Sequence, residues 1–202
     1  REKLHFMPYC TNRFSKSASS RKLKKIRKFL FVGKLIPKKN PDVVIEAFKC
    51  LCLKHPRMSL ELTIVGDGEM RHRITKICDG DKALNFYGFA NQSELGDIYQ
   101  AHDTIILPSD ERETWGLVIN EALNNGLAAI VSNRVGCRDD LIKKDKNGYI
   151  FSYGNVDELT VCMQKMAIGA MSMEQIQKTN LKLAKIYNHD VGAATFLGLC
   201  ND

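Results

Sequence analysis

The sequence has no long hydrophobic run, which excludes a chain built around a simple membrane-spanning helix. Its longest apolar stretches, such as residues 104–107 and 128–131, are far shorter than the roughly 20 residues that cross a bilayer. The first ten residues are polar and contain Pro8, so they do not resemble a secretory leader. The chain begins with Arg1 instead of Met, and we therefore expect it to be a piece of a longer protein.

Metal-ligand and disulfide patterns are also missing. The seven cysteines contain no Cys-x-x-Cys pair, and the five histidines are scattered without the spacing of metal ligands. The odd number of cysteines, several of them on expected core faces, favours reduced thiols over a disulfide framework. We therefore expect a cytoplasmic domain without a structural metal. Its 44% hydrophobic and 26% charged residues are ordinary for a globular protein.

Most of the positive charge lies in one segment. Residues 1–28 hold ten Lys or Arg and one Glu, whereas the rest of the chain holds twenty basic and twenty-two acidic residues. We interpret residues 1–28 as a basic arm or interdomain linker. A second interpretation is that residues 21–28 contact anionic lipid, which would make the protein peripheral on the cytoplasmic face of a membrane. Nucleic acid is not an expected partner, because the basic run of residues 21–28 contains no aromatic residue and the segment shows no recognition helix.

From residue 29 onward, short apolar runs alternate with amphipathic segments. This alternation predicts an α/β domain over residues 29–202, a Rossmann-like parallel sheet of about six strands with helices on both faces. Ligands bind such sheets beyond the carboxyl ends of the strands, where the glycine turns of this sequence fall. The predicted strands are 29–32, 60–65, 84–87, 104–107, 127–131 and 149–151; the predicted helices are 41–53, 69–78, 91–101, 116–124, 156–167, 173–187 and 191–199.

The most informative stretch is residues 108–126, which reads as a strand end, an acidic loop and a helix. Glu113 precedes the helix, Glu121 lies within it, and Gly116 stands near its start. A helix start offers free N–H groups and a positive dipole end, which favour an anion. Carboxylates beside such a site repel phosphate but accept hydrogen bonds from hydroxyl groups. The combination is suited to a nucleotide sugar.

The same stretch resembles a known signature. The pattern Pro-Ser-x-x-x-Glu-x-Trp-Gly-Leu-Val-x-x-Glu-Ala, with Glu113 and Glu121 eight positions apart, is similar to that of retaining GT-B glycosyltransferases of the glycogen-synthase-like group (family 4, glycosyl transferases group 1). Phe is commoner in that family where Trp115 stands. The resemblance implies that Glu113 accepts bonds from the sugar and Glu121 from the ribose. It also implies that the backbone amides of Gly116, Leu117 and Val118 face phosphate and hexose.

The loop of residues 33–40 is a second candidate element. A glycine turn with lysines before a helix is a plausible diphosphate cradle. It resembles the family's Gly-Arg-Leu-x-x-x-Lys-Gly element, which assigns diphosphate binding to Gly33, Lys34 and Lys39. Lys34 replaces Arg and so lacks the planar bidentate fork. Asn40 replaces Gly, a mild change because Asn tolerates left-handed backbone.

Two further positions match the family near the donor. Gly66 belongs to the turn after the second strand, and Phe89 follows the third strand, where relatives contact the nucleobase. Each also has a structural interpretation, as a tight turn and as a packing aromatic. We interpret residues 132–140, including Gly136, as structural. In catalysis we assign roles to Glu113, Lys39 and Glu121.

The resemblance implies one half of a two-domain enzyme. The chain would be the donor-binding C-terminal domain, the N-terminal acceptor-binding domain would be missing, and the final helix would reach toward it. The donor substrate is a nucleotide-diphosphate sugar, and neither cofactor nor metal is expected. The product would be a glycan, polysaccharide or glycolipid. Alone, the chain should bind donor and transfer little or nothing.

Two alternatives remain open at this stage. One is a flavodoxin-like domain that binds nucleotides or nucleotide sugars without transferring a sugar. The other is half of a sugar-nucleotide epimerase. The first would not need two glutamates beside a helix start, whereas the second tends to place His, Asp and Glu across two domains and is not fully excluded by this half. The sequence does not identify the nucleotide, the sugar or the acceptor.

Overall fold

The protein is described here from a computed structural model that covers residues 5–11 and 27–201. Most of the segment for which lipid contact was hypothesised, residues 21–28, lies outside the described residues. Its last residue, Lys28, opens the first strand and pairs with Glu61, with Nζ and Oε2 3.1 Å apart.

Six strands form one parallel sheet in the order β3-β2-β1-β4-β5-β6. The predicted α/β fold class, a Rossmann-like sheet with helices on both faces, is confirmed. The strands are β1 Lys28–Val32, β2 Glu61–Val65, β3 Leu84–Gly88, β4 Thr104–Leu107, β5 Ala128–Ser132 and β6 Gly148–Phe151. The helices are α1 Pro41–Lys54, α2 Arg71–Cys78, α3 Gln92–Ala101, α4 Leu117–Asn124, α5 Arg138–Leu141, α6 Val156–Ala167, α7 Met173–Ala184 and α8 His189–Asn201, with a 3-10 turn, η1, at Pro37–Lys39.

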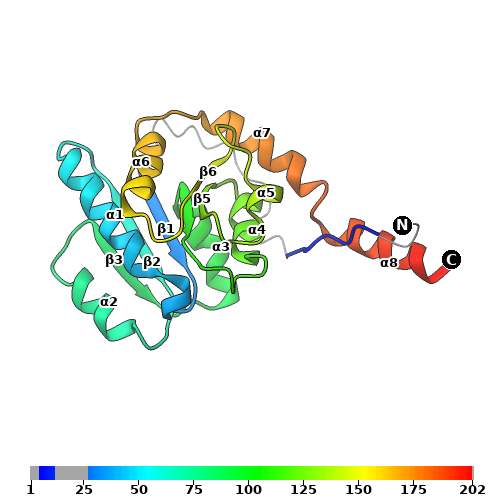
Figure 1. Ribbon diagram of the computed structural model, residues 1–202, viewed down its shortest axis with the longest axis horizontal. Coiled ribbons are helices and arrows are strands. Elements are labelled where there is room, and N and C mark those ends of the chain that lie inside the picture. Colours follow the sequence, from blue (N-terminus) through cyan, green and yellow to red (C-terminus); the bar gives the residue numbers. More distant parts are fainter. Residues whose placement is uncertain (1–4, 12–26, 202) are drawn as a thin grey trace.

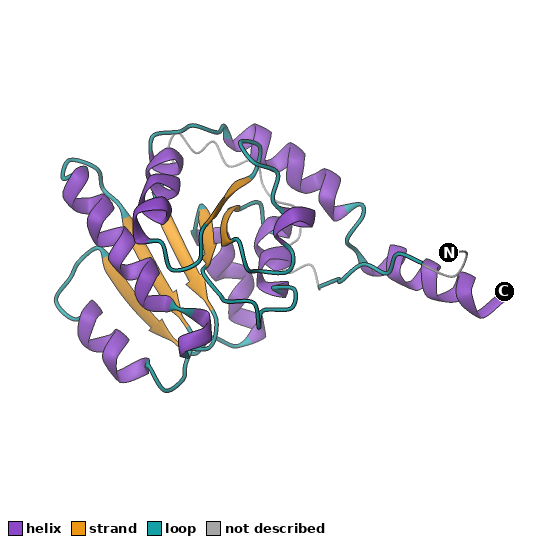
Figure 2. Cartoon of the chain, in the orientation of Figure 1, coloured by secondary structure: helices purple, strands orange, loops and turns teal. Residues whose placement is uncertain are grey.

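The sheet separates two apolar cores. Successive side chains of a strand point to opposite faces, so Phe29 and Phe31 enter one core and Leu30 enters the other. Helices α1, α2 and α6 cover the first core, and α3, α4 and α5 cover the second, while α7 contributes to both. Figure 2 shows the strands enclosed by these helices. Burial on both faces explains why the strands read as continuous apolar runs.

A few local predictions differ from the structure. Asn40 precedes α1 as expected, but its side chain makes no cap hydrogen bond, because its backbone is left-handed with φ 49°. Helix α7 ends at Ala184 instead of residue 187. The elements η1 and α5 were not predicted, since three or four residues are too few to show a periodic pattern.

The two ends of the described chain lie together, away from the sheet. Helix α8 extends from the body of the domain, and residues 5–11 run beside it (Figure 1). Phe196 and Leu197 of α8 are about 60% exposed, at 58% and 61%. Across residues 5–11 and 27–201, no helix has the length and apolar character needed to cross a bilayer.

A close backbone approach joins the loops that follow β1 and β2. The N–H of Gly33 donates to Val65 O at 3.0 Å, and the N–H of Leu35 donates to Asp67 O at 2.8 Å. A Cβ added at Gly66 would lie 1.8 Å from Gly33 O, and the Gly66 φ is +147°. Only glycine fits at this position without moving the loop that carries the candidate diphosphate cradle.

We expect Gly66→Ala to lower the free energy of unfolding by about 3 kcal/mol, because the new methyl group meets backbone and the φ is unfavourable. Gly80→Ala is the matched control. Gly80 also has a positive φ, +76°, but an added Cβ would meet nothing within 4 Å. The control should lose only about 1 kcal/mol in urea unfolding. Equal losses of unfolding free energy for the two variants would show that the approach of Gly66 to the Gly33 carbonyl does not require glycine.

Candidate active site

The candidate site lies where the strand order reverses. β1 and β4 are neighbours in the sheet although two strands separate them in the chain. In this pair, Phe29 lies opposite Thr104 and Leu30 lies opposite Ile105. The pairing stops there, two residues before the end of each strand. Beyond the carboxyl ends of these strands the loops diverge, which is where open α/β sheets bind ligands.

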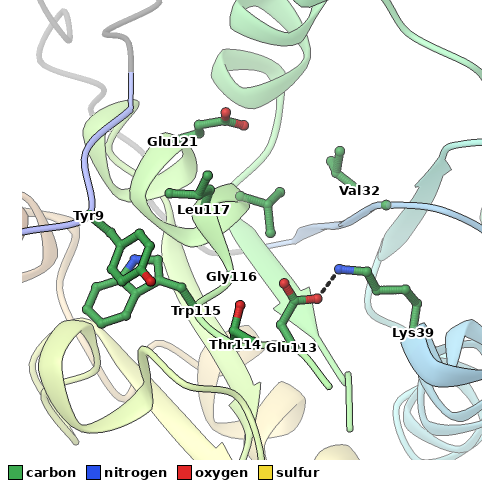
Figure 3. A pocket seen from close by; sticks show the side chains of 11 residues that line it. Tyr9, Val32, Lys39, Glu113, Thr114, Trp115, Gly116, Leu117 and Glu121 are labelled. Atoms are coloured by element: carbon green, nitrogen blue, oxygen red, sulfur yellow. Dashed lines mark hydrogen bonds and ion pairs between the residues drawn. The ribbon is translucent and has the colours of Figure 1, made fainter. Parts of the chain in front are cut away.

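A cavity of about 370 Å³ occupies this position. Figure 3 shows its walls, which come from the loop after β1, the loop after β4, the start of α4 and the N-terminal segment. It brings together seven of the ten predicted site residues. The lining residues are Tyr9, Val32, Gly33, Lys39, Glu113, Thr114, Trp115, Gly116, Leu117, Val118 and Glu121.

Lys39 and Glu113 form an ion pair inside the cavity, between Nζ and Oε2 (Figure 3). Their side chains are only 15% and 16% exposed. The turn η1 directs Lys39 toward the site, and the carbonyl of Lys38 accepts a hydrogen bond from Asp110 N at 3.0 Å. This bond ties the loop after β1 to the loop after β4 and so brings the two charged residues together.

The loop that carries Glu113 is also fixed from behind. Gly136 N donates to Glu113 O at 3.1 Å, and Cys137 N donates to Trp115 O at 3.0 Å. A Cβ at Gly136 would lie 1.9 Å from Thr114 O, so only glycine allows this approach. Gly136, which we had interpreted as structural, therefore supports the backbone of the site.

The start of α4 presents amides to the cavity. Gly116 is the N-cap of this helix, with φ 100°, a left-handed conformation that favours glycine. The N–H groups of the first helical residues, Leu117 and Val118, have no intrahelical acceptor by the geometry of a helix. Both residues line the cavity. Together with the helix dipole, these amides make the position favourable for an anion.

Glu121 lies on the inner face of α4, one helical turn further on. The buried hydroxyl of Tyr99 donates to its Oε2 at 2.7 Å. Burial raises the pKa of Glu121 above its ordinary value, and the hydrogen bond from Tyr99 opposes that shift. The carboxylate is therefore held in place, with lone pairs left to accept hydrogen bonds from a ligand.

Three predicted residues do not line this cavity. Lys34 is exposed next to Gly33. Gly66 packs against the Gly33 carbonyl from behind. Phe89 follows β3, two strands away from β1, and is 67% exposed. Their assignment to donor binding stays a prediction.

Sequence reasoning missed Tyr9. This residue belongs to the segment interpreted as an arm, yet its ring stacks on Trp115 with 4.9 Å between centroids and 22° between planes. Its carbonyl accepts a hydrogen bond from Asn120 Nδ2 at 3.1 Å. No local signal could have revealed it, because Asn120 is 111 residues away in the chain.

The arrangement is suited to an anion joined to a polyhydroxyl group. Lys39 and the α4 amides supply positive charge, and two carboxylates in the same cavity supply hydroxyl acceptors. Within residues 5–11 and 27–201, no cluster of three His, Cys, Asp or Glu side chains has the arrangement of a metal site.

Solved structures share the fold. The crystal structure of TarM superposes with a TM-score of 0.76 over 96% of this chain and 39% of that chain, at 16% sequence identity. HepE of Anabaena, crystallised in complex with UDP, gives a TM-score of 0.72 over 88% of this chain and 50% of that chain, at 17% identity. The domain is thus similar to one half of a GT-B structure.

Curated relatives include glycosyltransferases. The sulfoquinovosyl transferase SQD2 of Arabidopsis thaliana is 30% identical over 163 residues, which are 74% of this chain and 31% of that protein. A UDP-Gal:alpha-D-GlcNAc-diphosphoundecaprenol alpha-1,3-galactosyltransferase of Escherichia coli is 33% identical over 133 residues, 64% of this chain and 33% of that protein. The chain spans about a third of the length of these relatives.

The family model described as glycosyl transferases group 1 matches residues 12–180, well over half of the sequence. The predicted resemblance is confirmed at the level of the family. This chain belongs to the glycosyl transferases group 1 family.

Proposed function

We propose that the chain is the donor-binding domain of a glycosyltransferase that moves a sugar from a nucleotide-diphosphate sugar to an acceptor hydroxyl with retention of configuration. The observation that carries the proposal is the single cavity in which Lys39, Glu113, Glu121 and the start of α4 meet. Retention follows from the resemblance of the Glu113 to Glu121 signature. A glycan, polysaccharide or glycolipid is the corresponding product class.

Each residue has a role that its surroundings support. Breaking the bond to the sugar leaves negative charge on the diphosphate, and Lys39 with the amides of Leu117 and Val118 would stabilise that charge without a metal. Glu113 would accept hydrogen bonds from the sugar hydroxyls. Glu121, whose other contact is the Tyr99 hydroxyl, would accept from the ribose.

The ion pair between Lys39 and Glu113 also suits a donor that carries both a diphosphate and a sugar. A diphosphate would take the ammonium group of Lys39, and the sugar hydroxyls would then replace Lys39 as partners of Glu113. A nucleotide sugar satisfies both side chains at once. A free phosphate would leave the Glu113 carboxylate with fewer hydrogen-bond donors, although that side chain is only 16% exposed to water.

The acceptor-binding domain belongs to a part of the protein that this chain does not contain. The matched part of this chain covers only 31% and 33% of the two relatives described above. We expect the chain alone to bind donor and to transfer little. Among the structural neighbours, GtfA and GtfB form a complex, so some proteins of this fold also work with a separate partner chain. Contact of residues 21–28 with an anionic membrane stays a hypothesis.

A thermal-shift panel tests the proposed function. Ligands that bind only the native state stabilise it by RT ln(1 + [L]/Kd), about 2.7 kcal/mol at 100 times Kd. We expect one nucleotide sugar to raise the melting temperature more than flavin mononucleotide, free nucleotides or free sugars do. The best nucleotide is expected to be UDP-linked, since HepE and other neighbours were crystallised with UDP. Stabilisation by flavin alone, or by none of the ligands, would reject the proposal.

Lys39→Ala should weaken binding of the nucleoside diphosphate by roughly 10- to 150-fold. A charged hydrogen bond contributes about 1.5–3 kcal/mol, and about 1.4 kcal/mol corresponds to a factor of ten in affinity. Isothermal titration calorimetry measures the change directly. Lys38→Ala is the matched control, because it removes the same charge from the neighbouring residue, which does not line the cavity. Similar losses for both variants would assign the effect to general electrostatics.

Glu121→Gln should stabilise the unliganded domain at neutral pH. The raised pKa means that the folded state holds a proton more tightly than the unfolded state, so the contribution of Glu121 to stability is complete below its ordinary pKa and falls as pH rises through the folded value. Gln is neutral throughout and can still accept from Tyr99. The difference in unfolding midpoint between variant and wild type should therefore be large at pH 7 and vanish near pH 4.

The control for this prediction is Glu46→Gln, which changes an exposed glutamate of α1. The change in the Glu121→Gln difference between pH 4 and pH 7 should exceed the change seen for this control. A Glu121→Gln difference that stays constant from pH 4 to pH 7 would show that burial does not penalise the charged carboxylate.

A further inference from the structure

The N-terminal segment of the chain forms part of the wall of the donor cavity. Residues 5–11 lie beside α8 and reach the site at Tyr9 (Figures 1 and 3). Phe6 packs edge-on against Tyr187, with 5.8 Å between ring centroids and 82° between ring planes. Tyr187 in turn lies 5.7 Å from Trp115, centroid to centroid. The segment is thus joined to the domain through a continuous group of four aromatic rings.

A buried amide fixes this group in place. Asn120 is 4% exposed. Its Oδ1 accepts from Trp115 Nε1 at 2.7 Å, and its Nδ2 donates to the Tyr9 carbonyl at 3.1 Å. One side chain of α4 therefore sets both the orientation of the indole and the position of the Tyr9 backbone. A buried polar group with both ends satisfied specifies one arrangement.

The Tyr9 ring stands at a defined end of the cavity. Figure 3 shows it on the opposite side from Lys39, next to Trp115 and Thr114. Trp115 is two residues after Glu113, which the proposed function assigns to the sugar hydroxyls. The Tyr9 side chain is 54% exposed although one face of its ring is covered by the indole. It therefore keeps apolar surface and a hydroxyl available to a ligand.

We propose that Tyr9 is a further binding residue of the site and that its aromatic ring contacts the sugar of the donor. A sugar ring has apolar C–H faces between its hydroxyl groups, and an aromatic side chain offers an apolar surface with a polar tip. Glu113 would hold the hydroxyls from one side while Tyr9, backed by Trp115, covers the C–H face from the other. This inference rests on the proposed function, because it names the sugar of that donor as the ligand.

The chain supplies its own reporter for a test. Trp115 is the only tryptophan in the sequence and lies in the cavity wall, so quenching or enhancement of its fluorescence reports ligand binding. Wild type, Tyr9→Ala, Tyr9→Phe and Met7→Ala are each titrated with the best nucleotide sugar of the thermal-shift panel and with the corresponding nucleoside diphosphate. Calorimetry on the same samples provides affinities that do not depend on the Tyr9 and Trp115 stack.

Tyr9→Ala should weaken binding of the nucleotide sugar by about 2- to 12-fold, the range expected for one aromatic contact, and leave the nucleoside diphosphate unchanged. Tyr9→Phe keeps the ring and should bind both ligands like wild type. Met7→Ala is the matched control, since Met7 lies in the same segment and is 48% exposed but does not line the cavity. Because Tyr9→Ala also loses its stack on Trp115, affinities are compared at a temperature at which every variant is fully folded without ligand.

Three results would overturn the inference. Equal affinity of wild type and Tyr9→Ala for the nucleotide sugar would show that the ring makes no contact. Equal losses for sugar-linked and free nucleoside diphosphate would show that the segment supports the site in general and not the sugar. A loss in Tyr9→Phe as large as in Tyr9→Ala would assign binding to the hydroxyl. If wild type binds no nucleotide sugar at all, the proposed function itself fails, and this inference fails with it.

Discussion

The site depends on one backbone hydrogen bond between two loops, from Asp110 N to the carbonyl of Lys38. Lys39 and Glu113 are 74 residues apart in the chain, and each stands at the end of a different strand. The sheet brings the two strand ends together, and the contact between the loops helps to hold the two side chains face to face.

The same contact explains how two charged side chains can lie together in a partly buried site. A lone ammonium group or carboxylate that is only about 15% exposed would be costly, because partial burial removes the water that stabilises its charge. Each side chain serves as the counterion of the other. Burial raises the pKa of Glu121, and the hydrogen bond from the Tyr99 hydroxyl opposes that shift. The two glutamates of the signature therefore stand in different electrostatic environments.

The elements of the fold were predictable because their signals are local. β4 and α6 have the predicted bounds, and the other strands differ by about one residue, since strands buried on both faces are uninterrupted apolar runs. The residues around Glu113 were predictable from a dense local motif. Gly66 was identified as a turn, but its approach to the Gly33 carbonyl depends on the distance between two loops. Tyr9 was missed for the same reason, since its neighbours are defined only by the folded chain.

The residue at position 115 affects the distant contact between Asn120 and the N-terminal segment. Members of this family commonly have Phe where this chain has Trp115, and a Phe ring cannot donate a hydrogen bond. The indole N–H of Trp115 gives the Asn120 oxygen a partner, which fixes the amide so that its nitrogen faces the Tyr9 carbonyl. With Phe at position 115, the same buried amide would lose one partner, and its orientation would be free to reverse. Trp115, Asn120 and Tyr9 therefore act together. The tryptophan within the signature orients Asn120, and Asn120 holds the Tyr9 backbone at the cavity wall.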